Sequence, residues 1–391
     1  MNKQICIGTP YLKSHGSCVR VCADLELNGS KETIWFSVDR KYGQYLVDDR
    51  CDAFVVGLLT FAMKDGADIK CDAPVSRRLL YQLRHYLIPI LAANLSGYHA
   101  ILLQAEPIDI KLHCAKAVAT GWTGGVDCMY TLMKTLHAEE SSRRLTHLMI
   151  ANNGALESKD NQAMLKALVD KAEKGIASKL GLSVVGIDSN VHELVSERFL
   201  AVEAYRHAAV ILSLQKLFSV YYNSGTYEYA RFAFDADNCG YYEFVPLEYF
   251  STDSTTFYSA YGSCPRWQKL KELSDYPLAY GMLHPCIYAL PEHNCGKCGK
   301  CVRTMAALYG LGTLDRFSEV FDTEEFYRNK DRYIADVLAH KESQHYGEAL
   351  ALMKRRGIEP SPAAMRMARA MKAAKQVVDN RREQLEKKLL K

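Results

Sequence analysis

Apolar and polar side chains alternate over residues 19–27 (VRVCADLEL), and the pair Asn28-Gly29 that follows strongly favours a two-residue hairpin turn. Further along, apolar residues recur at helical spacing, and Ser76 stands where a helix N-cap is expected. The predicted elements are strands over 19–27 and 33–38, helices over 53–64 and 76–91, and a strand or strand pair over 101–110, interrupted by Pro107. This pattern predicts an N-terminal α+β domain over residues 1–112, in which we identify no chemical motif.

From residue 116 onward, short apolar strands alternate with amphipathic helices. The predicted elements are strands over 116–121, 145–152 and 183–188, helices over 127–137 and 161–180, long helical segments through 191–222, and an aromatic strand around 248–252. Alternation of this kind predicts an α/β fold, a parallel sheet with helices on both faces. Ligands of such sheets bind beyond the carboxyl ends of the strands, where a glycine turn stands in this chain.

The charge is unevenly distributed along the chain. Residues 341–391 hold thirteen Lys/Arg and six Asp/Glu, a balance of +7, which leaves −3 of the total +4 for the rest. We therefore expect a main domain over 113–340 and a basic helical tail over 341–391, interrupted at Pro360 and Pro362. A solvated helix is the favoured interpretation of this tail, and nucleic-acid binding through it stays open.

Composition narrows the class of protein further. The first residues show no apolar signal segment, and no run of 18 apolar residues exists, so we expect neither secretion nor a membrane-spanning helix. Thirteen cysteines without a secretion signal then indicate a reducing cytoplasm. The sequence leaves a homo-oligomer open.

Four cysteines stand close together in HPCIYALPEHNCGKCGKCV: Cys286, Cys295, Cys298 and Cys301. Four thiolates at this spacing can close a tetrahedral shell around Zn²⁺, and the intervening glycines allow a tight backbone. The run lacks the trailing cysteine and proline of ferredoxins, which disfavours an iron–sulfur cluster. A closed four-thiolate site is normally structural, so we expect this metal to fix the fold rather than to react.

A second motif lies between the strand at 116–121 and the following helix. Its six residues are Thr123, Gly124, Gly125, Val126, Asp127 and Cys128. Paired glycines after a strand turn backbone N–H groups toward phosphate oxygens, and the helix N-terminus adds positive potential. Without further context a tight connection is the commoner explanation of such glycines. Asp127 would hold Mg²⁺ or cap the loop.

This hexapeptide resembles the SGGxDS motif of the PP-loop ATP pyrophosphatases, with Thr for the first Ser and Cys for the last. The resemblance implies a fold like that of the adenine nucleotide alpha hydrolases. It also implies ATP as a substrate, cleaved to AMP and pyrophosphate. Cys128 replaces a hydroxyl by a weaker donor.

The loop together with C-x8-C-x2-C-x2-C resembles the 7-cyano-7-deazaguanine synthase (QueC-like) family, over about residues 116–312. A basic segment before the first cysteine, PRWQKLKEL, adds to the likeness and makes Arg266 and Lys269 candidate catalytic residues beside Asp127. The resemblance implies adenylation of 7-carboxy-7-deazaguanine or a related deazapurine, then formation of an amide or nitrile.

The chain also departs from this family. A tyrosine-proline-aspartate-cysteine-arginine stretch near the substrate has no counterpart, and the family's stand-alone enzyme has neither the N-terminal domain nor the tail. Enlarged relatives occur in antiviral defence, so a protein acceptor for the deazaguanine is one hypothesis. The alternatives are a tRNA-modifying PP-loop enzyme and a non-catalytic, zinc-stabilised binding module.

Other polar residues are weaker candidates. Cys128 at a helix N-terminus would have a lowered pKa and could capture an acyl group, although a small filler explains it equally well. Arg206 and His207 lie on an apolar helix, where we expect a rim position. Asn223 is expected in a loop after that helix.

Overall fold

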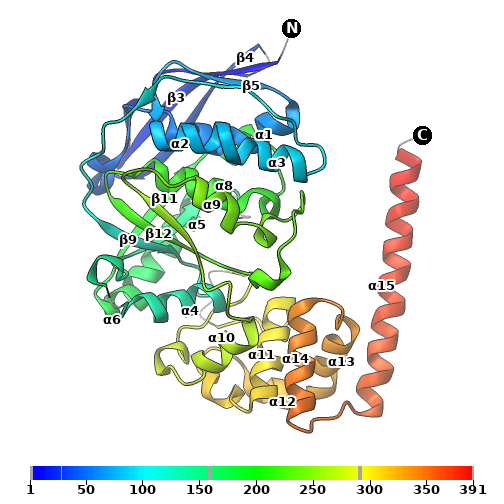
Figure 1. Ribbon diagram of the computed structural model, residues 1–391. Coiled ribbons are helices and arrows are strands. Elements are labelled where there is room, and N and C mark those ends of the chain that lie inside the picture. Colours follow the sequence, from blue (N-terminus) through cyan, green and yellow to red (C-terminus); the bar gives the residue numbers. More distant parts are fainter. Residues whose placement is uncertain (1–2, 28, 139, 157–159, 289–292, 390–391) are drawn as a thin grey trace. The chain divides into compact units, whose positions relative to one another are not determined.

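The structure, a computed structural model, describes residues 3–27, 29–138, 140–156, 160–288 and 293–389 (Figure 1). The chain divides into two compact units. Unit 1 comprises residues 1–122 and 130–264, and unit 2 comprises residues 123–129 and 265–391. These units divide the chain at residues 122/123, 129/130 and 264/265. The domain boundaries expected near residues 112 and 340 stay predictions.

Unit 1 is built on one sheet of 11 strands in the order β13-β12-β9-β10-β11-β4-β3-β1-β5-β7, with β2 paired to β3. The strands are β1 (Gln4–Ile7), β2 (Tyr11–His15), β3 (Cys18–Leu27), β4 (Ser30–Asp39), β5 (Asp68–Cys71), β7 (Leu103–Gln104), β9 (Ala117–Gly121), β10 (His147–Asn152), β11 (Ser183–Ser189), β12 (Phe218–Ser224) and β13 (Thr256–Ala260). A second sheet pairs β6 (Val75–Ser76) with β8 (Pro107–Ile108). The expected α/β class is confirmed as a large, mostly parallel sheet flanked by helices.

The predicted N-terminal hairpin is present. Strands β3 and β4 pair antiparallel, with Leu27 opposite Ser30, so the turn has two residues; Asn28 lies outside the described residues. Gly29 has a φ of +83°, a conformation that glycine adopts without steric cost. Beyond the hairpin, β4 pairs antiparallel with β11 through Val38 and Ile187. This pairing makes the N-terminal strands and the later strands one continuous sheet.

Strands β9 to β13 run parallel in the order β13-β12-β9-β10-β11. Strand β9 therefore stands where the order along the chain reverses, between β10 and β12. Such a switch point opens a crevice at the carboxyl ends of the strands, where α/β proteins bind ligands. The glycine turn leaves the carboxyl end of β9 at this point.

The helices of unit 1 follow most predicted segments. They are α1 (Asp52–Asp65), α2 (Arg77–Gln82), α3 (Ile88–Asn94), α4 (Val126–Thr135, which begins in unit 2), α5 (Asn161–Ala172), α6 (Ser178–Leu180), α7 (Val191–Leu194), α8 (Phe199–Leu212) and α9 (Phe244–Tyr249). Single π-helical turns, Leu83–Leu87 and Glu173–Ala177, join α2 to α3 and α5 to α6. Helix α1 is buried almost along its whole length, with α8 beside it in the core.

Three local expectations are wrong. The helical pattern predicted to reach residue 222 ends at Leu212, because Phe218–Ser224 is rich in aromatic side chains and pairs with β9 and β13 as a strand. Glu248 and Tyr249 end α9 instead of forming an aromatic strand. Ser76 does not cap its helix, since its hydroxyl donates to the fully buried carboxylate of Asp52.

Unit 2 is helical. Its helices are α10 (Arg266–Leu273), α11 (Gly299–Leu311), α12 (Thr323–Arg328), α13 (Lys330–Ala339), α14 (Gln344–Arg355) and α15 (Pro362–Leu389). Helix α11 packs closely on α14, and α13 packs on α15. The tail is interrupted as predicted, since α14 ends before Pro360 and α15 begins at Pro362.

Candidate functional site

The glycine loop of unit 2 is shaped by one close contact. Gly124 has a φ of +76°, and a Cβ atom at this position would lie 3.0 Å from the Cβ of His284. The backbone N–H of His284 donates to the Gly124 carbonyl at 2.7 Å, and the Gly125 N–H donates to the Thr123 hydroxyl at 3.3 Å. Helix α4 begins at Val126, so the loop sits at a helix N-terminus. Glycine is required at 124 both by the backbone conformation and by the neighbouring chain.

Asp127, in the first turn of α4, is the centre of a buried charge cluster. Its carboxylate accepts from Arg266 Nη1 and, at 3.0 Å, from Lys269 Nζ. Both cations come from α10 and are only 7% and 2% exposed. Burial by itself would raise the pKa of Asp127, but Arg266 and Lys269 outweigh it and hold the pKa at about 2. The three predicted catalytic residues therefore lie together.

The charge cluster around Asp127 should affect how the free energy of unfolding changes at acidic pH. Because the pKa of Asp127 is about 2 in the folded protein and near 3.9 unfolded, its ionisation stabilises the fold above pH 4 and is lost as the pH falls toward 2. The difference in the free energy of unfolding amounts to about 2.6 kcal/mol. We expect urea unfolding to show Asp127→Asn less stable than wild type at pH 5, with the two curves converging near pH 2. The exposed Glu324→Gln serves as a control, and curves that stay parallel would contradict the assignment.

Cys128 is a packed thiol. It is buried, and burial raises its pKa, the reverse of the lowering expected for an activated nucleophile. Its Sγ donates to the Gly125 carbonyl at 3.2 Å and lies 3.5 Å from the Thr123 hydroxyl. These contacts favour the loop-filler interpretation of Cys128 over acyl capture.

The four cysteines converge as their spacing predicts. The sulfur atoms of Cys286, Cys295, Cys298 and Cys301 all lie within 4.8 Å of one another. Cys298 is the N-cap of α11 and Cys301 lies in its first turn, while Gly296, with a φ of +67°, reverses the chain between Cys295 and Cys298. Backbone N–H groups of Lys297 and Cys298 point at Cys295 Sγ, at 3.4 and 3.3 Å. Four thiolates with backbone N–H donors suit Zn²⁺, and the described residues offer no other group of three or more metal-ligating side chains.

Asn294 fixes the backbone around the cysteine cluster through its side-chain hydrogen bonds. No sequence motif indicates this role. Its Oδ1 accepts from the Cys286 N–H at 3.2 Å, and its Nδ2 donates to the carbonyls of Leu283 and Val320, both at 3.0 Å. Such outer contacts orient metal ligands. His284, two residues before Cys286, donates its backbone N–H to Gly124, so one short segment connects the cysteine cluster with the glycine loop.

Unit 1 carries a separate polar cluster at the carboxyl ends of β10 and β11. Asn152 Nδ2 donates to Asp188 at 2.6 Å, and the side chain of Asn153 is fully buried with no hydrogen-bond partner among the described residues. Arg206 donates to the carbonyls of Asn153 and Val195, at 3.3 and 3.0 Å. The expected rim position of Arg206 is therefore wrong: it is 2% exposed and holds the chain after β10 in place.

His207 and Asn223 are interior as well. Burial lowers the pKa of His207 to about 4, so the ring is neutral at physiological pH. Its Nδ1 lies 3.3 Å from Asn223 Oδ1, and the Asn223 amide donates to the buried Glu243 at 3.0 Å. Asn223 lies in strand β12, not in the expected loop. Buried hydrogen bonds of this kind fix the end of β12.

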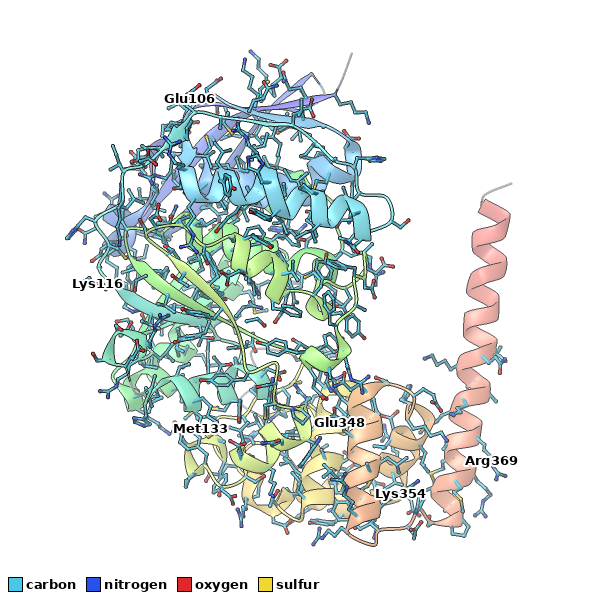
Figure 2. All side chains as sticks on the ribbon, viewed as in Figure 1. Glu106, Lys116, Met133, Glu348, Lys354 and Arg369 are labelled. Carbon is cyan, nitrogen blue, oxygen red and sulfur yellow. The ribbon has the colours of Figure 1, made fainter. Side chains whose placement is uncertain are left out.

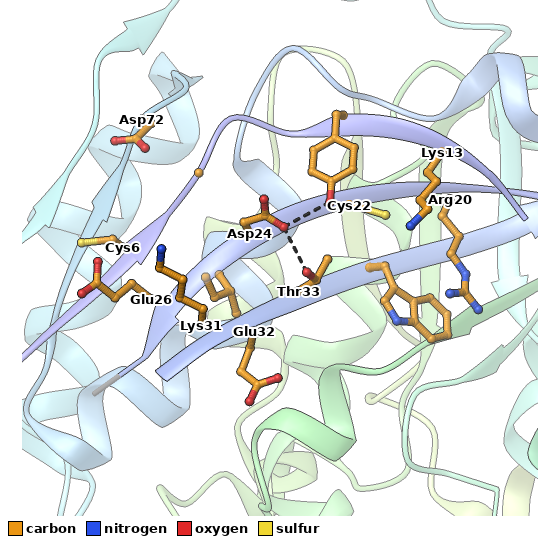
Figure 3. A pocket seen from close by; sticks show the side chains of 14 residues that line it. Cys6, Lys13, Arg20, Cys22, Asp24, Glu26, Lys31, Glu32, Thr33 and Asp72 are labelled. Carbon is orange, nitrogen blue, oxygen red and sulfur yellow. Dashed lines mark hydrogen bonds between the residues drawn. The ribbon is translucent and has the colours of Figure 1, made fainter. Parts of the chain in front are cut away.

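The N-terminal strands hold a hollow that the sequence did not predict (Figure 3). It has a volume of about 800 Å³ and opens on the sheet face formed by β1 to β4. Tyr11 and Thr33 donate to Asp24, and the Arg20 guanidinium lies 3.8 Å over the Trp35 ring. Both acidic and basic side chains line the hollow, so the lining does not indicate whether a ligand would be an anion or a cation.

The fold and sites define an α/β protein with a switch-point glycine loop and a four-cysteine cluster. No family model, curated protein or solved structure matches the chain. In the described part of the chain, no helix combines the length and apolar character needed to cross a bilayer. The resemblance to the QueC-like family therefore rests only on the sequence motifs, the glycine loop and the cysteine spacing.

Proposed function

We propose that this protein is an ATP-dependent enzyme that adenylates a carboxylate, releases pyrophosphate and then forms a C–N bond. One observation carries the proposal: two buried cations, Arg266 and Lys269, converge on Asp127 at the first turn after the glycine loop. Buried cations beside backbone N–H groups at a helix N-terminus favour a polyphosphate. A purely structural ion pair would not need the adjacent glycine loop at a switch point.

The residues divide the proposed chemistry among them. Loop N–H groups at Gly124 and Gly125 would bind phosphate oxygens, with the Thr123 hydroxyl as an additional donor. Arg266 and Lys269 would neutralise the charge that develops on the departing pyrophosphate. Asp127 would exchange its cation partners for the Mg²⁺ that accompanies ATP, because a carboxylate with a pKa near 2 is ionised at all working pH values.

The cysteine cluster takes a structural part in this proposal. Zn²⁺ held by Cys286, Cys295, Cys298 and Cys301 would close the chain around a tetrahedral centre with no open position. Its contribution to function would be the placement of His284, whose backbone fixes Gly124.

The proposed substrate is 7-carboxy-7-deazaguanine or a related deazapurine, as the family resemblance implies, with ammonia or a protein amine as the nitrogen nucleophile. Activation as an acyl adenylate would convert a poor leaving group into a good one.

Pyrophosphate release tests this function. The purified protein, loaded with zinc, is incubated with ATP, Mg²⁺, 7-carboxy-7-deazaguanine and ammonia as the nitrogen nucleophile, and pyrophosphate and AMP are measured. We expect both products in equal amounts, at a rate that depends on the deazapurine. Absence of AMP with this acid and every amine or protein acceptor tested would refute the proposal.

A second candidate, tRNA modification, is favoured by one feature. Helix α15 carries the exposed side chains of Arg366, Arg369, Lys372 and Lys375, and no acidic residue occurs from Pro362 to Val377. Figure 2 labels Arg369 on this helix. Such a helix can bind phosphates. Pyrophosphate release that requires tRNA, and not the free deazapurine, would favour this candidate.

A further inference from the structure

The hollow on the N-terminal strands carries its polar side chains in an order that its mixed composition does not reveal (Figure 3). Residues that stand directly opposite each other on paired strands point to the same face of the sheet. Across β2, β3 and β4 the register defines three successive rows on this face: Lys13 with Arg20, then Tyr11 with Cys22 and Trp35, then Asp24 with Thr33. The hollow is lined in turn by two cations, two aromatic rings and a carboxylate.

The first row holds two cations that have no acidic partner. Lys13 lies directly opposite Arg20, and within the described part of the chain neither side chain forms an ion pair or a hydrogen bond. The Nε atom of Arg20 is also buried without a partner among the described residues. Like charges directly opposite each other destabilise an antiparallel pair, and a buried N–H without an acceptor costs free energy. An anion with several oxygen atoms, bound between Lys13 and Arg20, would remove both costs.

The second row offers a surface for stacking. Tyr11 and Trp35 lie on either side of Cys22, whose side chain is small. The Arg20 guanidinium lies 3.8 Å over the Trp35 ring, so each group restricts the orientation of the other. Nucleobases stack on aromatic rings and on guanidinium planes alike. This row therefore suits a planar heterocycle.

The third row ends in a carboxylate with one unused oxygen atom. The hydroxyls of Tyr11 and Thr33 both donate to Asp24 Oδ1, at 3.1 and 3.0 Å. Asp24 Oδ2 accepts no hydrogen bond from the described residues. An ionised carboxylate only accepts hydrogen bonds. Guanine presents two adjacent N–H donors on one edge, whereas adenine presents an amino group beside an acceptor nitrogen, so Asp24 favours guanine.

The remaining charges of the lining support this direction. Glu26 lies directly opposite Lys31, so these two charges compensate each other. Glu32 and Asp72 lie on the Asp24 side of the aromatic row, away from the two cations. The hollow therefore has a cationic end and an acidic end, and it suits a ligand with an anionic group at one end and N–H donors at the other.

We propose that this hollow binds a guanine mononucleotide, with the phosphate at Lys13 and Arg20, the base on Trp35 and its N–H edge on Asp24. Arg20 and Asp24 are four residues apart in β3, a separation of about 13 Å. An extended mononucleotide spans a comparable length from its phosphate to the far edge of its base. The volume of about 800 Å³ lies in the range of about 300–1,000 Å³ usual for small-molecule sites. This site lies in unit 1 and does not depend on the ATP chemistry proposed for the glycine loop.

Isothermal titration calorimetry on the full-length protein, with GMP, AMP and inorganic phosphate as separate probes, tests the proposal. We expect GMP to bind at least about tenfold more tightly than AMP or inorganic phosphate. Lys13→Met should weaken GMP binding about tenfold, because one of the two cations that hold the phosphate is lost. Lys31→Met removes the same charge from the other end of the hollow and should leave GMP binding unchanged, as should Lys269→Met in unit 2.

Asp24→Asn tests the recognition of the base. The asparagine oxygen can still accept from Tyr11 and Thr33, while its amide group replaces an acceptor by a donor. An asparagine side chain matches the donor and acceptor pattern of adenine. We therefore expect GMP binding to fall at least about tenfold and AMP binding to become tighter than in the wild type, a reversal that a merely structural Asp24 would not produce.

Each contrary result overturns the proposal. If the wild type binds no GMP, or binds inorganic phosphate as tightly as GMP, the hollow is not a nucleotide site. Equal binding of GMP and AMP by the wild type would remove the role of Asp24. Loss of GMP binding in Lys269→Met would place the nucleotide at the glycine loop instead. Pyrophosphate release is measured separately, so the function proposed for the glycine loop stands or fails without this site.

Discussion

Replacing Lys269 by methionine is expected to lower the rate of pyrophosphate release by a factor of at least about 100. Removing a preorganised group that stabilises transition-state charge typically costs about 10²–10³ in rate. Lys269 is 2% exposed and lies 3.0 Å from Asp127, so its ammonium group is fixed beside the glycine loop. Initial rates at saturating ATP, Mg²⁺ and deazapurine measure the effect.

Lys271→Met is the matched control, because Lys271 lies on the same helix and is exposed. It should release pyrophosphate at the wild-type rate. Equal rates in the Lys269 and Lys271 variants would mean that the buried cluster is structural only.

Asp127→Asn separates the two roles of the carboxylate. Turnover should be lost because Mg²⁺ loses its ligand, whereas metal-free pyrophosphate should still bind, because Arg266 and Lys269 are released from their acidic partner. If this variant loses pyrophosphate binding together with its zinc, the substitution has damaged the fold of unit 2.

Cys301→Ser is expected to abolish stoichiometric zinc binding and to destabilise unit 2 by on the order of 5 kcal/mol or more. Structural zinc sites contribute apparent binding free energies of about 10–16 kcal/mol, and this energy is folding energy. Cys301 is fully buried in the first turn of α11, so its loss also loosens the helix on which α14 packs. Metal analysis and a thermal melt measure both effects.

Cys18→Ser, a half-buried cysteine in β3 outside the cluster, should retain zinc and melting temperature. Treatment of the wild type with a strong chelator should reproduce the Cys301→Ser melt, and the pyrophosphate binding that we propose for the glycine loop should be lost in parallel. A chelated protein with an unchanged melt would show that the cluster holds no structural metal.

The local sequence pattern predicted best those features that depend on residues close together in the chain. The hairpin at residues 19–38 and the helix that became α1 follow their sequence patterns closely, because turn chemistry and hydrophobic spacing are local. The cysteine cluster was predictable for the same reason, since all four ligands fall within sixteen residues. Helical spacing failed at residues 218–222, where pairing with two neighbouring strands outweighed the local pattern.

By itself the sequence determined the α/β class, the four-cysteine cluster and the glycine loop that follows a central strand. Only the tertiary structure decided which charges meet. Asp127 pairs with Arg266 and Lys269, 139 and 142 residues away. It also placed Arg206 in the interior and joined β4 to β11. These cases have one physical reason. A buried charge or strand edge needs a partner, because leaving it unpaired away from water costs free energy. The local sequence pattern does not indicate where along the chain that partner lies.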